Sequence, residues 1–217
     1  MKKSDPEAIK DQMISYLQEK YGEEFIPISF ESSGFAYSYD TLWVYPKDGT
    51  KADRFEVRGS KAKDNTYVIS DGYYGIYIKP QYEAVLSGFV SEIYQDFKLF
   101  TDFGEGVWSE QLNKNTKIEE IYEIDRLVSS SNVIFVKEDS AKNIDDEEAI
   151  RKIAENMKAK KMVGNIQLYV VYNDKFDSIG LEALSLTNAQ MKDVFVRDYV
   201  MIKVNRSLEV KKYGEGT

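Results

Sequence analysis

Residues 70–77 bring together the side chains best suited to recognise a ligand. Two glycines frame the paired Tyr73 and Tyr74, and Tyr77 follows shortly after them. A tyrosine offers an apolar ring and a hydroxyl that donates or accepts a hydrogen bond, so three of them could line a recognition groove. The competing interpretation is a glycine-assisted turn whose tyrosines pack against a helix. We predict Tyr73, Tyr74 and Tyr77 as binding residues, with packing as the alternative.

The chain has no Cys and no His among its 217 residues. It therefore forms no disulfide, no Cys/His zinc site, no thiol nucleophile and no histidine-based triad. Glycosidase-like chemistry stays open, because it needs only two carboxyl groups about 5 to 9.5 Å apart. With 37 Asp and Glu residues such a pair is possible, but sequence spacing does not identify it. We expect a binding domain rather than an enzyme, with no cofactor and no metal site, and keep a carboxylate-only hydrolase as a third alternative.

Two motifs that resemble catalytic signatures have simpler explanations. Ser60 and Lys63 match a Ser-x-x-Lys pattern, but the partner motifs of that enzyme class are missing from the chain. Residues 102–104 spell Asp-Phe-Gly, yet the catalytic and glycine-rich loops of kinases are missing as well. We interpret the first motif as a hairpin tip and the second as chance.

The charge balance argues against nucleic acid as a partner. The net charge is −8 and the isoelectric point is near 4.9, whereas binding to phosphate backbones relies on Lys and Arg. Residues 1–110 hold 12 basic and 19 acidic side chains, and residues 111–217 hold 17 and 18. The first half also contains 11 of the 16 tyrosines. An acidic, tyrosine-rich surface suits contact with a protein or a small ligand.

Hydrophobic spacing predicts an α+β fold that begins with a helix and a strand meander. Asp5 can cap a helix over residues 6–21, which Gly22 would end. Short aromatic-rich runs follow at residues 25–31, 35–45, 54–59 and 66–70 and predict antiparallel strands. After Pro80, apolar residues at helical spacing up to Phe97 predict a second helix that docks on the sheet.

The remaining sequence predicts a smaller lobe with a β-α-β unit. Residues 118–124 and 132–137 are expected to be strands, and a helix capped at Asp145 should run to about Met162 before a strand at 166–172. A short helix at 184–193, a final strand at 199–204 and a frayed tail at 211–217 complete the prediction. Gly104 and Gly106 mark the expected boundary, which gives lobes 1–103 and 104–217 that could share one core.

Several segments of the first half carry a family resemblance. They are residues 16–25, 45–49, 55–57 and 71–75, the last leading into Tyr82 and Glu83. In these segments the chain resembles uncharacterised exported proteins and lipoproteins of Gram-positive, Clostridia-like bacteria. The likeness covers roughly residues 8–98 and extends more weakly into the β-α-β unit. It implies a Gram-positive source and residence at the cell surface, and it transfers no catalytic residue.

The sequence leaves two functions open that differ in cellular location. The first is an exported binding domain at the bacterial cell surface, held to the membrane only through an N-terminal anchor removed from this sequence. The second is a cytoplasmic acidic partner, such as an immunity protein that blocks a basic toxin. The start of the chain lacks a signal-peptide hydrophobic stretch, so Met1 is either a native start or a replacement for a removed signal.

Overall fold

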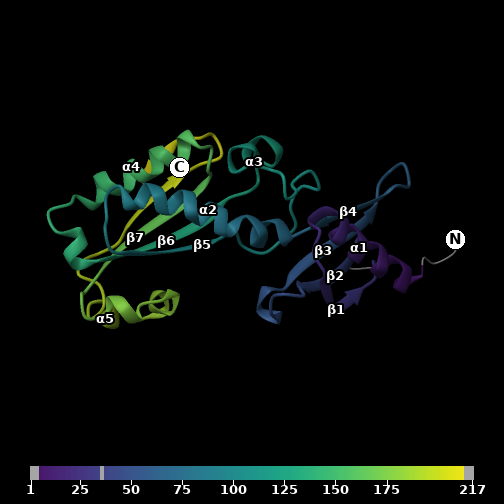
Figure 1. The fold of residues 1–217 in the computed structure, drawn as a ribbon, viewed down its shortest axis with the longest axis horizontal. Coiled ribbons are helices and arrows are strands. Elements are labelled where there is room, and N and C mark those ends of the chain that lie inside the picture. Colours follow the sequence, from purple (N-terminus) through teal and green to yellow (C-terminus); the bar gives the residue numbers. More distant parts are fainter. Residues whose placement is uncertain (1–4, 35–36, 213–217) are drawn as a thin grey trace. The chain divides into compact units, whose positions relative to one another are not determined.

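The computed structural model describes residues 5–34 and 37–212 and has the predicted α+β fold (Figure 1). The chain forms two compact units. The first consists of residues 1–78 and 105–117, and the second of residues 79–104 and 118–217. This division differs from lobes 1–103 and 104–217, because residues 79–104 belong to the second unit and residues 105–117 return to the first.

In the first unit, helix α1 (Pro6–Tyr21) packs on a four-stranded antiparallel sheet. Met13 and Leu17 of α1 are fully buried, and a Cβ on Gly59 in the sheet would lie 2.6 Å from Met13 Cε, so the helix touches the sheet backbone. The strand order is β1-β2-β3-β4, and a short 3-10 helix, η1 (Lys51–Asp53), precedes β3. The strands are β1 (Phe25–Glu31), β2 (Asp40–Pro46), β3 (Phe55–Lys61) and β4 (Tyr67–Asp71).

Local signals at both ends of α1 explain why its predicted bounds are confirmed. The Asp5 side chain accepts a hydrogen bond from Glu7 N at 3.1 Å, and Pro6 occupies the first helical turn. Gly22 adopts φ 74°, a left-handed conformation that ends the helix at little steric cost. These interactions act within a few residues, so the sequence alone specifies them.

The second unit is built on a five-stranded sheet in the order β5-β6-β7-β8-β9. Strands β6 and β7 run parallel, and helix α4 (Asp146–Ala159) connects them, which confirms the predicted β-α-β unit. The other neighbouring pairs in this sheet are antiparallel. The strands are β5 (Phe97–Asp102), β6 (Ser130–Lys137), β7 (Gly164–Val171), β8 (Val200–Val204) and β9 (Val210–Lys212).

Apolar side chains are buried on both faces of this sheet. Helix α2 (Tyr73–Ser91) and α4 cover one face (Figure 1), where Leu86, Ile153 and Ile134 are fully buried. The segment between β7 and β8 covers part of the other face, where Phe135 and Phe195 pack. That segment holds the 3-10 helices η3 (Phe176–Ser178) and η4 (Leu181–Ser185) and the short helix α5 (Asn188–Met191). A further 3-10 helix, η2 (Glu138–Ala141), follows β6.

The predicted strand at residues 118–124 is wrong, because this segment is helix α3 (Ile118–Ile124). Ile121 is buried, while Ile118 and Tyr122 are half-buried. Their spacing of three and four residues places all three on one helical face. The run is too short for its spacing to outweigh the β-preference of isoleucine in a sequence-based prediction.

The bounds predicted for the second helix are also wrong. Helix α2 begins at Tyr73, so Tyr73 and Tyr74 lie in its first turn rather than in a loop, and Pro80 lies inside it. The helix ends at Ser91, and Phe97 begins β5 opposite Val136. Pairing with β6, which no local pattern reveals, overrides the helical spacing of Phe97.

Two details near the C-terminus differ from the predicted elements. The region expected to hold a short helix at 184–193 contains η4 and α5 as separate turns. Lys211 and Lys212, predicted as part of a frayed tail, pair with β8 in strand β9. The rest of that tail, residues 213–217, lies outside the described residues.

Candidate functional site

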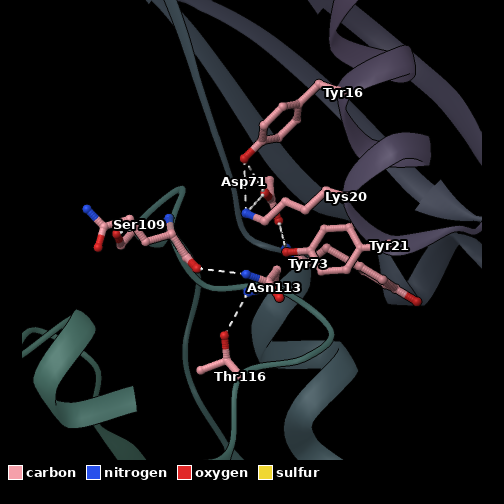
Figure 2. Close-up of polar contacts among 9 residues, drawn as sticks. Tyr16, Lys20, Tyr21, Asp71, Tyr73, Ser109, Asn113 and Thr116 are labelled. Atoms are coloured by element: carbon pink, nitrogen blue, oxygen red, sulfur yellow. Dashed lines mark hydrogen bonds and ion pairs between the residues drawn. The ribbon is translucent and has the colours of Figure 1, made fainter. Parts of the chain in front are cut away.

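A buried carboxylate, Asp71, joins helix α1 to the start of helix α2 in the first unit (Figure 2). Asp71 Oδ2 accepts hydrogen bonds from Lys20 Nζ at 2.7 Å and from Tyr16 Oη at 3.3 Å. Asp71 Oδ1 accepts from Tyr21 Oη at 2.8 Å and from Tyr73 N at 3.0 Å. Asp71 has no exposed surface, and 7% of the Lys20 side chain is exposed. We call Tyr16, Lys20, Tyr21 and Asp71 the Asp71 cluster.

Local structure explains how these side chains converge. Tyr16 and Lys20 are four residues apart on α1 and therefore lie on one helical face. Asp71 is the last residue of β4, and the following Gly72 permits close packing, since a Cβ there would lie 2.4 Å from the carbonyl oxygen of Gly106. Trp108 N donates to the Asp71 carbonyl at 2.9 Å, which fixes the strand end from the other side.

Burial raises the pKa of both tyrosines in the Asp71 cluster above the ordinary value, and the negative charge of Asp71 raises it further. Tyr16 and Tyr21 therefore stay protonated at neutral pH and donate hydrogen bonds to Asp71. With four donors around it, the carboxylate is fully engaged. We conclude that the Asp71 cluster is a buried hydrogen-bond network that connects α1 to the end of β4, and that Asp71 is not an exposed acid or base.

The three predicted binding tyrosines pack in the same unit. Tyr73 is buried and its hydroxyl donates to Glu23, while its ring meets that of Phe55 at 5.0 Å. Tyr74 is fully buried and donates to the carbonyl of residue 116 at 3.3 Å. Tyr77 is half-buried and its hydroxyl lies 3.4 Å from the carbonyl of residue 114. Packing accounts for these contacts, and a binding role for the three residues stays a prediction.

Each of the four buried carboxylates in the described residues has its own donors. Asp40 accepts from Tyr67 Oη and from a backbone N–H, both at 2.6 Å. Arg58 binds both oxygens of Glu56 at 2.7 Å. Arg197 binds both oxygens of Asp146 in the same bidentate way, at 2.5 and 2.9 Å. The fourth buried carboxylate is Asp71 with its four donors. These contacts show carboxylates engaged as structural ion pairs and hydrogen-bond acceptors.

A concave surface in the second unit lies where strand β8 separates from β7. It has a volume of about 940 Å³, within the range of small-ligand sites. We call it the tyrosine hollow. Its lining residues are Tyr169, Tyr172, Asn188, Met191, Lys192, Phe195, Val196, Arg197, Asp198 and Tyr199.

The shape of the tyrosine hollow follows from a bulge in the strand pairing. Leu168 pairs with Val200, so regular antiparallel pairing would bring residue 197 opposite Val171. Val171 instead faces Phe195, which leaves two extra residues on the strand that leads into β8. Residues 197–199 therefore bow away from β7, as bulged strands do. On the concave side, Tyr199 stacks on Tyr169 with ring centres 5.0 Å apart.

Neither the Asp71 cluster nor the tyrosine hollow was predicted from the sequence. The spacing of Tyr16 and Lys20 was a local signal, but their partner lies 51 residues beyond Lys20. For the hollow, the available signal was Tyr169 inside one predicted strand and Tyr199 at the start of the next. Their contact depends on the bulge, which sequence patterns do not show.

Within residues 5–34 and 37–212, no group of three or more carboxylates is placed to hold a metal ion. In the same residues, no helix combines the length and the apolar character needed to cross a membrane.

The fold and these surfaces define a two-unit α+β domain with a tyrosine-lined hollow. No protein-family model and no curated protein matches the chain. The solved structure of a DUF5037 family protein from Ruminococcus gnavus is similar to it, with 17% identity, coverage of 90% of this chain and 91% of that chain, and a TM-score of 0.41. That neighbour comes from a Clostridia-like bacterium. Export and lipid attachment of this chain stay predictions.

Proposed function

We propose that this protein is a non-enzymatic binding domain, exported and membrane-tethered in its native form, that holds a ligand in the tyrosine hollow. The observation that carries the binding role is the hollow itself, with a volume of about 940 Å³ and an aromatic wall. Concave surfaces that combine aromatic rings with a few polar groups are the usual form of ligand sites. The structural roles of the buried carboxylates support binding over hydrolysis.

Binding is tested by screening the whole chain against a chemically diverse library of metabolites, saccharides, nucleotides and short peptides. Isotope-edited NMR spectra report which backbone amides shift. We expect saturable shifts centred on residues 169–172 and 188–199. Substrate turnover, or binding confined to other surfaces, would contradict the proposal.

The export half of the proposal rests on the sequence resemblance and needs its own experiment. Mass spectrometry of the N-terminus of the mature protein, isolated from its native host, identifies the first residue and any attached lipid. A lipidated or signal-cleaved start upstream of Lys2 supports surface residence. An unprocessed start at Met1 in the cytoplasmic fraction contradicts it and favours the acidic-partner alternative.

A further inference from the structure

The four aromatic rings beside the tyrosine hollow form a continuous series from the core to the surface. Phe135 is fully buried and stacks with Phe195, whose ring contacts Tyr169 at 5.0 Å. Tyr169 in turn stacks with Tyr199, with an angle of 25° between the rings. Exposure is 6% for Tyr169 and 49% for Tyr199. The buried ring of Tyr169 therefore packs against one face of Tyr199, and about half of the Tyr199 surface stays accessible to a ligand.

The rest of the hollow supplies polar groups of mixed charge. Asn188, Lys192 and Asp198 line it and are exposed. In the described part of the chain, no hydrogen bond or ion pair occupies the side chains of these three residues. An amide, an ammonium group and a carboxylate therefore remain available near an accessible aromatic ring.

We infer that the tyrosine hollow binds a neutral oligosaccharide, with one sugar ring stacked on Tyr199; this inference rests on the proposed function. A sugar ring has an apolar face of C–H bonds, which are attracted to the negative face of an aromatic ring. Its edge carries hydroxyls that both donate and accept hydrogen bonds. Asn188, Lys192 and Asp198 offer the matching donors and acceptors.

Other ligand classes fit the hollow less well. An extended peptide that adds a strand needs an unpaired strand edge. Strand β7 is paired with β6 on one side, and on the other Val196 N donates to the Val170 carbonyl at 2.9 Å. A nucleotide needs several cations for its phosphates, whereas Lys192 and Asp198 balance each other in the lining and Arg197 is already paired with Asp146. A neutral saccharide meets neither obstacle.

The inference is tested with four defined probes on the full chain. Cellotetraose, maltotetraose, mannotetraose and tetra-N-acetylchitotetraose are each titrated by calorimetry and by NMR. We expect at least one to bind saturably and to shift amides of residues 169–172 and 188–199. Tyr199→Ala should weaken that binding by about fivefold or more, through loss of the stacked ring, whereas Tyr199→Phe should stay within about twofold.

Tyr37→Ala is the matched control, because Tyr37 is 61% exposed, packs against another tyrosine ring at 5.4 Å and lies in the other unit. It should bind the saccharide as the unchanged chain does. If none of the four probes binds at the hollow, or if Tyr199→Ala binds equally well, the inference is overturned. A nucleotide or peptide that binds there instead would overturn the saccharide inference and leave the proposed function standing. If nothing in the wider library binds at the hollow, both fail.

Discussion

The Lys20 ammonium lies 2.7 Å from the Asp71 carboxylate and joins the end of helix α1 to the end of strand β4. Burying such a pair costs desolvation energy that the mutual attraction only offsets when further hydrogen bonds satisfy both groups. The hydroxyls of Tyr16 and Tyr21 supply these bonds to Asp71. The pair is therefore stable as part of a network, and removing Asp71 removes the acceptor that Lys20, Tyr16 and Tyr21 share.

Replacing Asp71 with Ala should destabilise the first unit strongly. The change leaves the Lys20 ammonium buried and uncompensated, so we expect the free energy of unfolding to fall by about 3–5 kcal/mol. Trp43 and Trp108 both lie in the first unit, so tryptophan fluorescence during urea unfolding reports on this unit. Glu24→Ala, at a carboxylate of the same unit whose side chain is 64% exposed, is the control and should change stability by no more than about 0.5 kcal/mol. Equal stability of the two variants would show that the Asp71 cluster contributes little.

The first unit should lose stability as the pH rises above 10. The pKa of Tyr21 is raised in the folded protein, mainly by burial and then by Asp71, while an unfolded tyrosine titrates near 10. Above pH 10 the unfolded chain therefore binds fewer protons than the folded chain, and the free energy of unfolding falls with pH. For Tyr21 alone the slope approaches about 1.4 kcal/mol per pH unit. Unfolding followed by tryptophan fluorescence between pH 8 and 11.5 measures this slope.

A Tyr21→Phe variant separates this effect from general alkaline unfolding. It loses the hydrogen bond to Asp71 and should start about 1–2 kcal/mol less stable at pH 8. Its slope above pH 10 should be shallower than that of the unchanged chain, because one titrating group has been removed. An unchanged slope would mean that Tyr21 does not govern the loss of stability.

Two glycine-to-alanine changes in the second unit should have opposite effects. A Cβ on Gly164 would lie 2.4 Å from the carbonyl oxygen of Ser130. Gly164→Ala therefore forces β6 and β7 apart and should lower the free energy of unfolding by about 1–3 kcal/mol. Gly88 is exposed inside α2, and a Cβ there meets nothing within 4 Å. Gly88→Ala should raise the free energy of unfolding by about 0.5–1 kcal/mol, because alanine has a higher helix propensity than glycine. Thermal unfolding by circular dichroism compares both variants, and a shift of both in the same direction would contradict this packing argument.

The pair formed by Arg197 and Asp146 should hold the bulge beside the tyrosine hollow. Arg197 lies in the bowed segment and binds Asp146 at the start of α4 through two hydrogen bonds. Lysine keeps the positive charge but cannot form the bidentate pair of hydrogen bonds with the carboxylate. We expect Arg197→Lys to raise hydrogen exchange at residues 196–199 severalfold and leave residues 164–168 of β7 unchanged. Unaltered exchange at 196–199 would show that other contacts fix the bulge.

The sequence by itself determined the parts of the fold that depend on neighbouring residues. Asp5 and Gly22 bound α1, and Asp145 caps α4 by accepting hydrogen bonds from the amides of residues 147 and 148. Short aromatic-rich runs also predicted the first sheet, and the spacing of apolar residues predicted the β-α-β unit. Caps and spacing act within one or two turns or strands, so their signals are present in short windows.

Tertiary structure alone decided the features that join distant segments. Phe97 continues a helical spacing yet lies in β5, because pairing with Val136 satisfies its backbone and its partly buried side chain packs against the core. Tyr73 and Tyr74 are held in a helix by packing with residues from other elements. The contact between Tyr169 and Tyr199 exists because two extra residues bow out of a strand pair. Such contacts arise from the balance of packing over the whole unit, which no local stretch of sequence encodes.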